Sequence, residues 1–315
     1  MEVMLKCSKL SKSYKEKVVL KGIDFEVYKG EILCILGPNG AGKSTTINIL
    51  TASLSSNGGE ISFKGRQINQ RRKELTDYKQ VLGIVPQDIA LYEELSAERN
   101  LRFFASLYGL HGEALNTAVE EALAFAGLTD RRKDKIKTFS GGMKRRLNIA
   151  CAIAHKPELV IMDEPTVGID PQSRNHILDS IRRLQENGMT VIYTTHYMEE
   201  VEAISTRIII MDYGAIIAEG TKEDLKESIG NDKRYTIELE ERKKIQAEDL
   251  FSIEGVKDVK IEENTLELSS LKGIENLDRI IALLSDQGEK IKNITSEATS
   301  LETVFLKLTG RKLRD

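Results

Sequence analysis

The sequence lacks any apolar run long enough to cross a lipid bilayer, which takes about 20 consecutive residues in a helix. Its first six residues also lack the charged and then apolar pattern of a secretory signal. Of the 315 residues, 40% are hydrophobic and 30% are charged, a composition typical of a globular protein with one large or two ordinary domains. We therefore expect a cytosolic chain that reaches a membrane only through a partner.

Cysteine is scarce, and neither sign of charge is in large excess. Cys7, Cys34 and Cys151 show no spacing typical of a metal site or a disulfide, and the last two lie in apolar runs as small core residues do. The formal net charge is −3; residues 231–315 hold 15 basic and 18 acidic side chains, which leaves 31 of each in residues 1–230. Neither part is basic enough to indicate nucleic-acid binding, and the guanine-reading sequence Asn-Lys-x-Asp does not occur.

What the sequence does contain is a glycine-rich segment that fits G-x-x-x-x-G-K-[ST] without gaps. Its residues are Gly37, Pro38, Asn39, Gly40, Ala41, Gly42, Lys43, Ser44 and Thr45. An apolar run at 31–36 precedes it and helical spacing follows it, so the loop is expected between a buried strand and a helix. Its backbone N–H groups would surround phosphate oxygens, Lys43 would reach the β- and γ-phosphates, and the Ser44 hydroxyl would bind Mg²⁺. The segment predicts binding of a nucleoside triphosphate.

Polar residues also end two later strands. The apolar run 159–162 stops at Asp163 and Glu164, where a phosphate site of this kind needs an acid that holds Mg²⁺ directly or through water. Glu164 is one residue further on, directed at the position of an attacking water. The run 191–195 leads into His196, a candidate for sensing the γ-phosphate. Two solvated acids at a strand end are the alternative, which the phosphate loop makes less favourable.

Three other features are weak when taken alone. Tyr14 could stack on a nucleotide base, although an exposed turn aromatic is the more common interpretation. Gln87 follows the strand pattern at 81–85, where open α/β sheets bind ligands, but most such glutamines are only solvated. Ser140-Gly141-Gly142 opens a helix that the serine can cap, and its glycines let an anion approach the first amides. Only the position of this tripeptide, about twenty residues before Asp163, supports a role in phosphate binding.

The order of patterns indicates a domain over residues 1–230 and a smaller one over 231–315. Strand patterns cover residues 3–10, 18–28, 58–63, 81–85, 159–163 and 191–195. The first two are expected to pair antiparallel across a turn at 11–17, and residues 95–139 read as a helical insert. The last 85 residues follow the order β-α-β-β-α-β of a small α/β sandwich. A packing or dimerisation module is the favoured interpretation of this domain, and a regulatory ligand site is the alternative.

Together these segments resemble the motif set of an ABC-transporter ATPase subunit over about residues 3–225. The matching segments, in order, are Gly37–Thr45, Gln87, Ser140-Gly141-Gly142, Asp163-Glu164, Gly168-Ile169-Asp170 and His196. The resemblance implies an α/β P-loop NTPase fold with a mixed sheet core, an antiparallel β subdomain and the helical insert, followed by a small α+β domain. It also implies ATP hydrolysis with Mg²⁺ on the cytoplasmic face of the cell membrane, coupled to a separate transmembrane permease subunit.

The resemblance assigns roles that the residues alone leave open. It implies that Tyr14 stacks on adenine and that Gln87 links Mg²⁺ to the insert facing the membrane partner. Glu164 becomes the catalytic base, and His196 holds the γ-phosphate and water. Ser140–Gly142 would bind ATP across a homodimer or pseudo-dimer with two shared sites.

The signature segment departs from the usual Leu-Ser-Gly-Gly-Gln, because this chain has Phe139 and Met143 around the Ser-Gly-Gly core. Any polar contact of the final Gln is therefore in doubt, whereas ATP binding is not. With residues 166–171 and 301–310, these two residues resemble bacterial subunits of the daunorubicin- and linearmycin-resistance exporter type, which implies a drug, antibiotic or lipid-like cargo. A soluble ABC ATPase acting on DNA or ribosomes is the rival, disfavoured because 95–139 is too short for a long coiled coil and only one ATPase domain is present.

Overall fold

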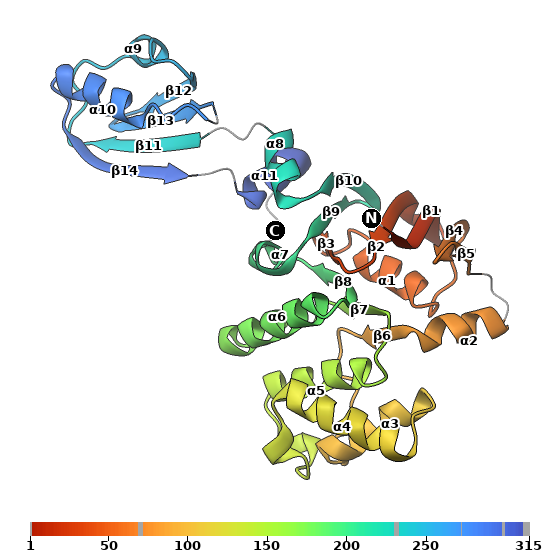
Figure 1. Ribbon diagram of the computed structural model, residues 1–315. Helices are drawn as coiled ribbons and strands as arrows, with labels where there is room; N and C mark the ends of the chain where they lie inside the picture. The colour runs from red at the N-terminus through yellow and green to blue at the C-terminus, as the bar shows by residue number, and fades with distance from the viewer. Residues whose placement is uncertain (1, 69–71, 230–232, 272, 298–299, 311–315) are drawn as a thin grey trace. The chain divides into compact units, whose positions relative to one another are not determined.

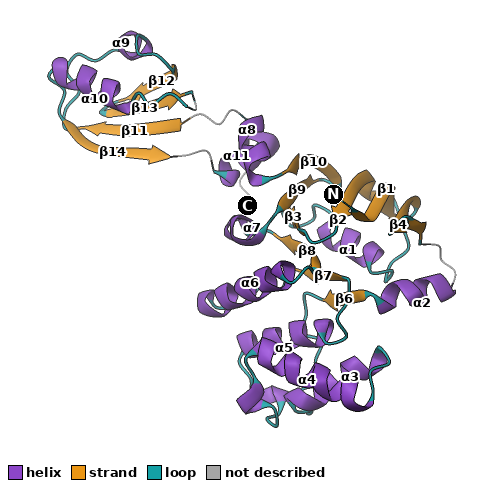
Figure 2. Cartoon of the chain, in the orientation of Figure 1, coloured by secondary structure: helices purple, strands orange, loops and turns teal. Residues whose placement is uncertain are grey.

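The computed structural model describes residues 2–68, 72–229, 233–271, 273–297 and 300–310. The chain divides into two compact units between Lys222 and Glu223. Figure 1 follows the elements along the chain, and Figure 2 separates helices from strands. Among the described residues, no helix is both long and apolar enough to cross a membrane. The domain boundary after residue 230 stays a prediction.

A six-stranded sheet lies at the centre of the first unit. In spatial order its strands are β10 (Ala215–Gly220), β9 (Arg207–Asp212), β3 (Ile32–Leu36), β8 (Thr190–Thr195), β7 (Leu159–Asp163) and β6 (Leu82–Val85). The ladders from β9 through β6 are parallel, and only β10 runs antiparallel to its neighbour. All residues of β3, β7 and β8 are buried, as expected of strands covered on both faces. This arrangement confirms the mixed sheet core.

A second sheet in the same unit is antiparallel, with the order β2 (Lys17–Tyr28), β1 (Val3–Tyr14), β4 (Gly58–Phe63) and β5 (Arg66–Gln67). The predicted turn at 11–17 is wrong in extent, because β1 continues to Tyr14 and pairs it with Lys17. Ser11 to Ser13 are only partly buried, so their polar side chains stay solvated while their backbone continues the ladder. Register shifts in this stretch accommodate the departure from strict alternation.

Four helices of the first unit lie outside the insert: α1 (Lys43–Leu50), α2 (Arg72–Gln80), α6 (Pro171–Glu186) and α7 (Met198–Ile204). The sequence did not predict α2, because it is strongly charged and carries little apolar periodicity. It is anchored by Tyr78, which is 5% exposed and donates its hydroxyl to the Leu50 carbonyl at 2.8 Å. Tyr78 also meets Phe63 of β4 edge to face, with the ring centroids 5.4 Å apart, so tertiary contacts hold a helix that propensity alone leaves open.

The predicted helical insert is confirmed, and α5 (Gly141–Ile153), which lies beyond its predicted bounds of residues 95–139, packs into the same core. The insert comprises α3 (Ala97–Leu107), α4 (Gly112–Ala126), the short turns η1 (Thr129–Arg131) and η2 (Ile136–Thr138), and then α5. Leu101, Val119, Leu123 and Leu147 from three of these helices are fully buried together. The same helices lie at the yellow to light-green part of the chain in Figure 1. The insert is therefore a packed subdomain attached to the sheet.

The second unit is built on an antiparallel sheet with the order β12 (Val256–Glu262), β13 (Thr265–Ser270), β11 (Lys233–Leu239) and β14 (Ile291–Glu297). Its helices are α8 (Lys222–Ser228), α9 (Ala247–Phe251), α10 (Leu277–Asp286) and α11 (Leu301–Thr309). Apolar residues of β11 and β13 form a core with Leu250, Ile280 and Leu284 of α9 and α10. The alternate residues Thr236, Glu238 and Glu267 belong to the opposite, polar face. The predicted order of elements is confirmed.

A buried carboxylate holds the segment that enters α9. Glu289 is 5% exposed and accepts N–H hydrogen bonds from Lys243, Lys244 and Ile245 at 2.7–3.1 Å. Burial alone would raise the pKa of this carboxyl, but the three backbone donors outweigh burial and hold the pKa below its ordinary value of 4.5. A depressed folded-state pKa contributes stability above the unfolded pKa and loses it as pH falls through the folded pKa.

We expect Glu289→Gln to destabilise the second unit at neutral pH, because the neutral amide accepts these bonds more weakly and brings an unmatched donor. Hydrogen-exchange protection of β11 and of residues 243–250 in the full chain should fall at pH 7. The difference from wild type should shrink as pH falls below 4.5. The exposed Glu241→Gln is the matched control, and equal protection of the two variants at pH 7 would contradict the assigned role.

Candidate nucleotide site

The glycine-rich segment forms a loop between the end of β3 and the start of α1, as predicted (Figure 1). Gly42 has a φ of 108°, and a Cβ there would lie 2.8 Å from Leu20 Cδ2. A Cβ on Gly37 would lie 2.4 Å from the Met211 carbonyl oxygen. A larger residue at position 37 would clash with the backbone of β9, and one at position 42 would be strained at this φ and would displace the Leu20 side chain. The loop therefore presents the N-terminal amides of α1 at the carboxyl edge of the sheet, where an anion binds.

Lys43 is buried, with only 4% of the residue exposed. Its ammonium donates to the carbonyls of Gly37 and Pro38 at 2.8 and 3.2 Å. It also lies 3.0 Å from Glu164 Oε1, in an ion pair buried on both sides. A buried ammonium needs negative partners, and phosphate oxygens are stronger partners than carbonyls.

Glu164 stands between this lysine and His196. Its φ is 44°, a left-handed conformation that glutamate rarely adopts and that the surroundings must impose. Its N–H donates to the Thr194 hydroxyl at 2.9 Å, and its Oε2 lies 3.1 Å from His196 Nδ1. The carboxylate is thus held at both oxygens, one toward Lys43 and one toward His196. A strained, buried carboxylate beside an imidazole has the arrangement of an oriented general base.

Asp163 and Ser44 meet beside the loop, with the serine hydroxyl 3.4 Å from Asp163 Oδ1. Thr194 donates its hydroxyl to the same carboxylate oxygen at 2.6 Å. Among the described residues there is no cluster of three or more His, Cys, Asp or Glu that could hold a metal ion. One hydroxyl and one carboxylate fit Mg²⁺, which favours hard oxygen ligands and takes the rest from phosphates and water. Thr194 was missed by sequence reasoning, since a threonine inside a buried strand carries no distinctive signal.

A cavity of about 550 Å³ brings together eight of the predicted residues, whereas Gly37, Pro38, Ala41, Asp163 and His196 are not in its lining. Its lining includes Asn39, Gly40, Gly42, Lys43, Ser44, Thr45, Gln87 and Glu164. Gln87 comes from the loop after β6, where Arg145 of α5 donates to the carbonyls of Pro86 and Gln87. Arg145 is 3% exposed, and burial lowers the pKa of its guanidinium. It connects the helical insert to the cavity, and only the structure identifies it.

Tyr14 and the signature segment lie outside the lining of this cavity. Tyr14 is 48% exposed. Among the described residues, the cavity lining includes Val18, Val19 and Tyr213 but not Tyr14. Ser140 caps α5 by accepting from the Met143 N–H at 3.3 Å. A Cβ on Gly142 would lie 2.2 Å from the Ser173 hydroxyl of α6, so glycine is required for this close packing. Within one chain, the two predicted halves of the nucleotide site are separate surfaces.

The parallel sheet, the phosphate loop at its carboxyl edge and the Asp163-Glu164-His196 group define a P-loop protein that hydrolyses a nucleoside triphosphate. Residues 20–167 match the family model for the ABC transporter. Residues 220–309 match the C-terminal domain of ATP-binding proteins described as DrrA1-3-like.

Whole-chain relatives agree with these matches. The linearmycin resistance ATP-binding protein LnrL of Bacillus subtilis is 48% identical over 99% of this chain and 100% of its own length. The daunorubicin/doxorubicin resistance ATP-binding protein DrrA of Streptomyces peucetius is 34% identical over 99% of this chain and 94% of its own.

Solved structures agree as well. The structure of cbiO1 from Clostridium perfringens, part of an ABC transporter complex, matches with a TM-score of 0.67 and 30% identity, over 72% of this chain and 92% of that one. A dimeric post-hydrolysis state of the ATP-binding cassette MJ0796, bound to ADP and Pi, matches with a TM-score of 0.63 and 28% identity, over 69% and 98%.

The chain therefore belongs to the ATP-binding subunits of ABC transporters, in the group that carries a DrrA-like C-terminal domain. It binds ATP, and its hydrolysis is coupled to transport. Members of this family work with transmembrane subunits and form dimeric cassettes. Nothing in these comparisons supports the rival function on DNA or ribosomes.

We expect Gly42→Ala to weaken ATP binding at least about tenfold, because the added Cβ is strained at this φ and collides with Leu20. Equilibrium binding of a fluorescent ATP analogue measures the effect. Gly30→Ala is the control, since Gly30 also has a positive φ, 77°, but open space around its Cβ position. Equal losses in both variants would mean that backbone strain alone, and not the loop's fit, is responsible.

Proposed function

We propose that this subunit hydrolyses ATP to drive export of a drug, antibiotic or lipid-like compound through a separate transmembrane permease, at the cytoplasmic face of the membrane. Its relatives are named for resistance to linearmycin and to daunorubicin, and others for Nod factor export. The match to LnrL extends over both units of the chain. The observation that carries the catalytic part is the buried contact of Glu164 with Lys43 on one side and His196 on the other.

In the proposed reaction, a water oxygen attacks the γ-phosphorus of ATP and ADP leaves. Glu164 accepts the proton of that water, and His196 holds the carboxylate in place through Nδ1. The Lys43 ammonium lies 3.0 Å from Glu164 Oε1, so this carboxylate oxygen is already engaged by a cation. We therefore infer that the β- and γ-phosphates draw Lys43 away from Glu164, so that substrate binding itself frees the base.

Mg²⁺ would be held by the Ser44 hydroxyl and Asp163, with Gln87 at the edge of the same cavity. When bound, the ion neutralises phosphate charge that develops during hydrolysis. Thr194 holds Asp163 through its hydroxyl. Tyr14, at the end of β1, is proposed to stack on the adenine ring of ATP, next to Val18 and Val19.

Ser140, Gly141 and Gly142 are proposed to complete the ATP site of a second ATPase domain, in a homodimer or a pseudo-dimer with two shared sites. Ser140 and Gly141 are exposed at the N-terminus of α5, where amides and a positive dipole favour an anion. Because these residues do not line the Lys43 cavity of their own chain, a second copy has to supply them there. Met143 follows as an apolar residue and supplies no polar side-chain contact.

Glu164→Gln should slow ATP turnover by roughly 10²–10⁴-fold, the usual contribution of a general base, while ATP and Mg²⁺ still bind. Since hydrolysis opens the shared site, the variant should accumulate as a dimer with ATP but not with ADP. Steady-state hydrolysis and size-exclusion chromatography measure the two effects. The exposed Glu186→Gln is the control; unimpaired turnover of Glu164→Gln would refute the base, and a slow monomeric variant would refute the shared site.

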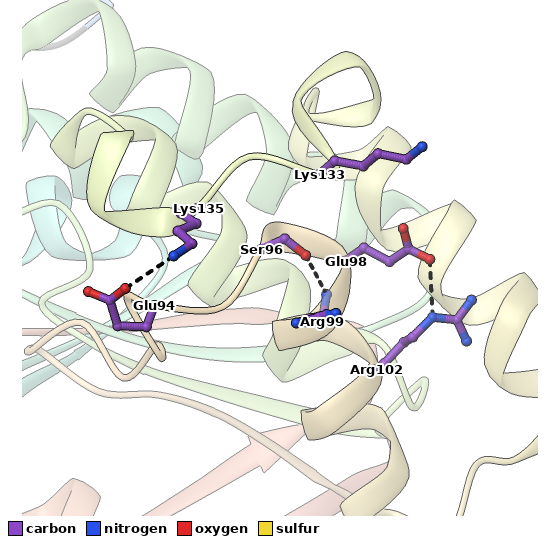
Figure 3. A pocket seen from close by; sticks show the side chains of 7 residues that line it. All are labelled: Glu94, Ser96, Glu98, Arg99, Arg102, Lys133 and Lys135. Carbon is purple, nitrogen blue, oxygen red and sulfur yellow. Dashed lines mark hydrogen bonds and ion pairs between the residues drawn. The ribbon is translucent and has the colours of Figure 1, made fainter.

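The permease is proposed to dock on the helical insert near Gln87. Tyr92 and Phe103 are 51% and 38% exposed, and their rings meet edge to face at 4.9 Å. Arg102, which precedes Phe103 in α3, lines a charged pocket together with Glu94, Ser96, Glu98, Arg99, Lys133 and Lys135, as Figure 3 shows. Exposed aromatic rings next to paired charges are typical of a protein interface rather than of a solvated face.

Phe103→Ser should abolish recovery of this subunit with membranes that contain its co-expressed permease, because the aromatic cluster loses its exposed anchor. ATP hydrolysis by the purified subunit should be unchanged. Phe251→Ser is the matched control, since Phe251 is 48% exposed in the second unit. Membrane recovery that persists in Phe103→Ser and fails in Phe251→Ser would move the docking surface to the C-terminal unit.

A further inference from the structure

A carboxylate outside the predicted motifs is fully buried beneath the catalytic group. Glu200 of α7 is 0% exposed and accepts hydrogen bonds from three hydroxyl groups. Thr166 donates to Oε1 at 2.6 Å, and Tyr193 and Thr195 donate to Oε2 at 2.9 and 2.7 Å. The Arg174 Nε of α6 lies 3.5 Å from Oε1. One side chain therefore contacts β8, α6 and the loop after β7.

Two of these hydroxyls belong to the segments that carry Glu164 and His196. Thr166 is two residues after Glu164, in a turn closed by the Val167 N–H donating to the Glu164 carbonyl at 3.3 Å. Thr195 directly precedes His196, and its hydroxyl also accepts the Tyr197 N–H at 2.9 Å. The backbone is thus fixed on both sides of His196. Both catalytic segments share one anchor, the Glu200 carboxylate.

Burial of the Glu200 carboxylate is unfavourable, so we do not expect this side chain to serve only as packing. Burying a carboxylate is unfavourable unless it is hydrogen-bonded and balanced by charge. Burial and the nearby Glu200 raise the pKa of Tyr193 well above its ordinary value, so its hydroxyl stays protonated and keeps donating. The Arg174 guanidinium also stacks over the Tyr197 ring at 4.8 Å, on the segment that follows His196. Every group around Glu200 therefore acts to hold the same two segments.

We propose that Glu200 is a positioning residue for ATP hydrolysis, which sets the contact between Glu164 and His196 by holding Thr166 and Thr195. The proposal rests on the proposed roles of Glu164 and His196. Glu200 is not among the residues that line the cavity, and its hydrogen bonds go to Thr166, Tyr193 and Thr195. It should therefore affect the chemical step and leave ATP binding unaltered.

Glu200→Gln should lower kcat at least about tenfold with less than about twofold change in KM for ATP, because an amide cannot accept from three hydroxyls and must itself donate. Full-chain protein is used, with ATP-analogue binding as the check that the site is intact. Loss of binding in proportion to kcat would mean that Glu200 supports the fold in general, and would overturn the proposal.

Thr195 separates hydrogen bonding from packing. Thr195→Val keeps the shape but removes the hydroxyl, whereas Thr195→Ser keeps the hydroxyl and removes a methyl group. Positioning through Glu200 predicts that the serine variant retains most of kcat and that the valine variant loses at least about tenfold. At a residue 1% exposed, pure packing predicts the reverse order, because serine leaves a cavity. That reverse order would overturn the proposal.

Combination with Glu164→Gln makes the test independent of the proposed base. If Glu200 acts through Glu164, adding Glu200→Gln to Glu164→Gln should lower the residual rate no further. A further tenfold loss would show that Glu200 acts elsewhere and would overturn the inference alone. A Glu164→Gln variant with wild-type turnover would instead overturn the proposed function, whatever the Glu200 variants do.

Discussion

The first unit is organised around one buried positive charge, the ammonium of Lys43. Only 4% of this residue is exposed, and its neighbours supply the negative partners: two backbone carbonyls of the loop and the carboxylate of Glu164. This need fixes the loop against β2 and β9 and brings the end of β7 toward α1. In the proposed function, ATP satisfies the same need better than the protein does. Exchange of one set of partners for the other then links binding to the release of Glu164.

The parallel sheet makes this meeting possible. β3, β7 and β8 are neighbours in the sheet but lie far apart in sequence, and parallel strands end at a common edge. Lys43, Glu164 and His196 each follow one of these ends. Thr194 accepts the Glu164 N–H, and Glu200 accepts the hydroxyl of Thr195, which precedes His196. In the proposed function, these hydroxyl groups position the reacting residues because each binds two partners at once.

Motifs with fixed spacing were predictable from the sequence, because a phosphate loop or an acid at a strand end has a local signature. The insert, the strands that end at Leu36, Asp163 and Thr195, and the element order of the C-terminal unit followed from apolar periodicity. β9, β10 and the order of the strands within each sheet came only from the structure. The supporting residues were not predictable either: Thr194 and Glu200 look like ordinary strand and helix residues until tertiary packing buries them. Arg145 looked like one more charge of a basic helix, and the contacts of Tyr78 in α2 depend on tertiary packing. The role of Tyr14 came from family resemblance, and the geometry leaves it as a proposal.

The second unit has one sheet face covered by α9 and α10, while Thr236, Glu238 and Glu267 alternate onto the other. Because this face is polar, the hydrophobic effect cannot drive its association with a partner. Contact through it would consist of solvated charge pairs and hydroxyls, which salt screens over about 8 Å at physiological ionic strength. Such association would be reversible and sensitive to ionic strength.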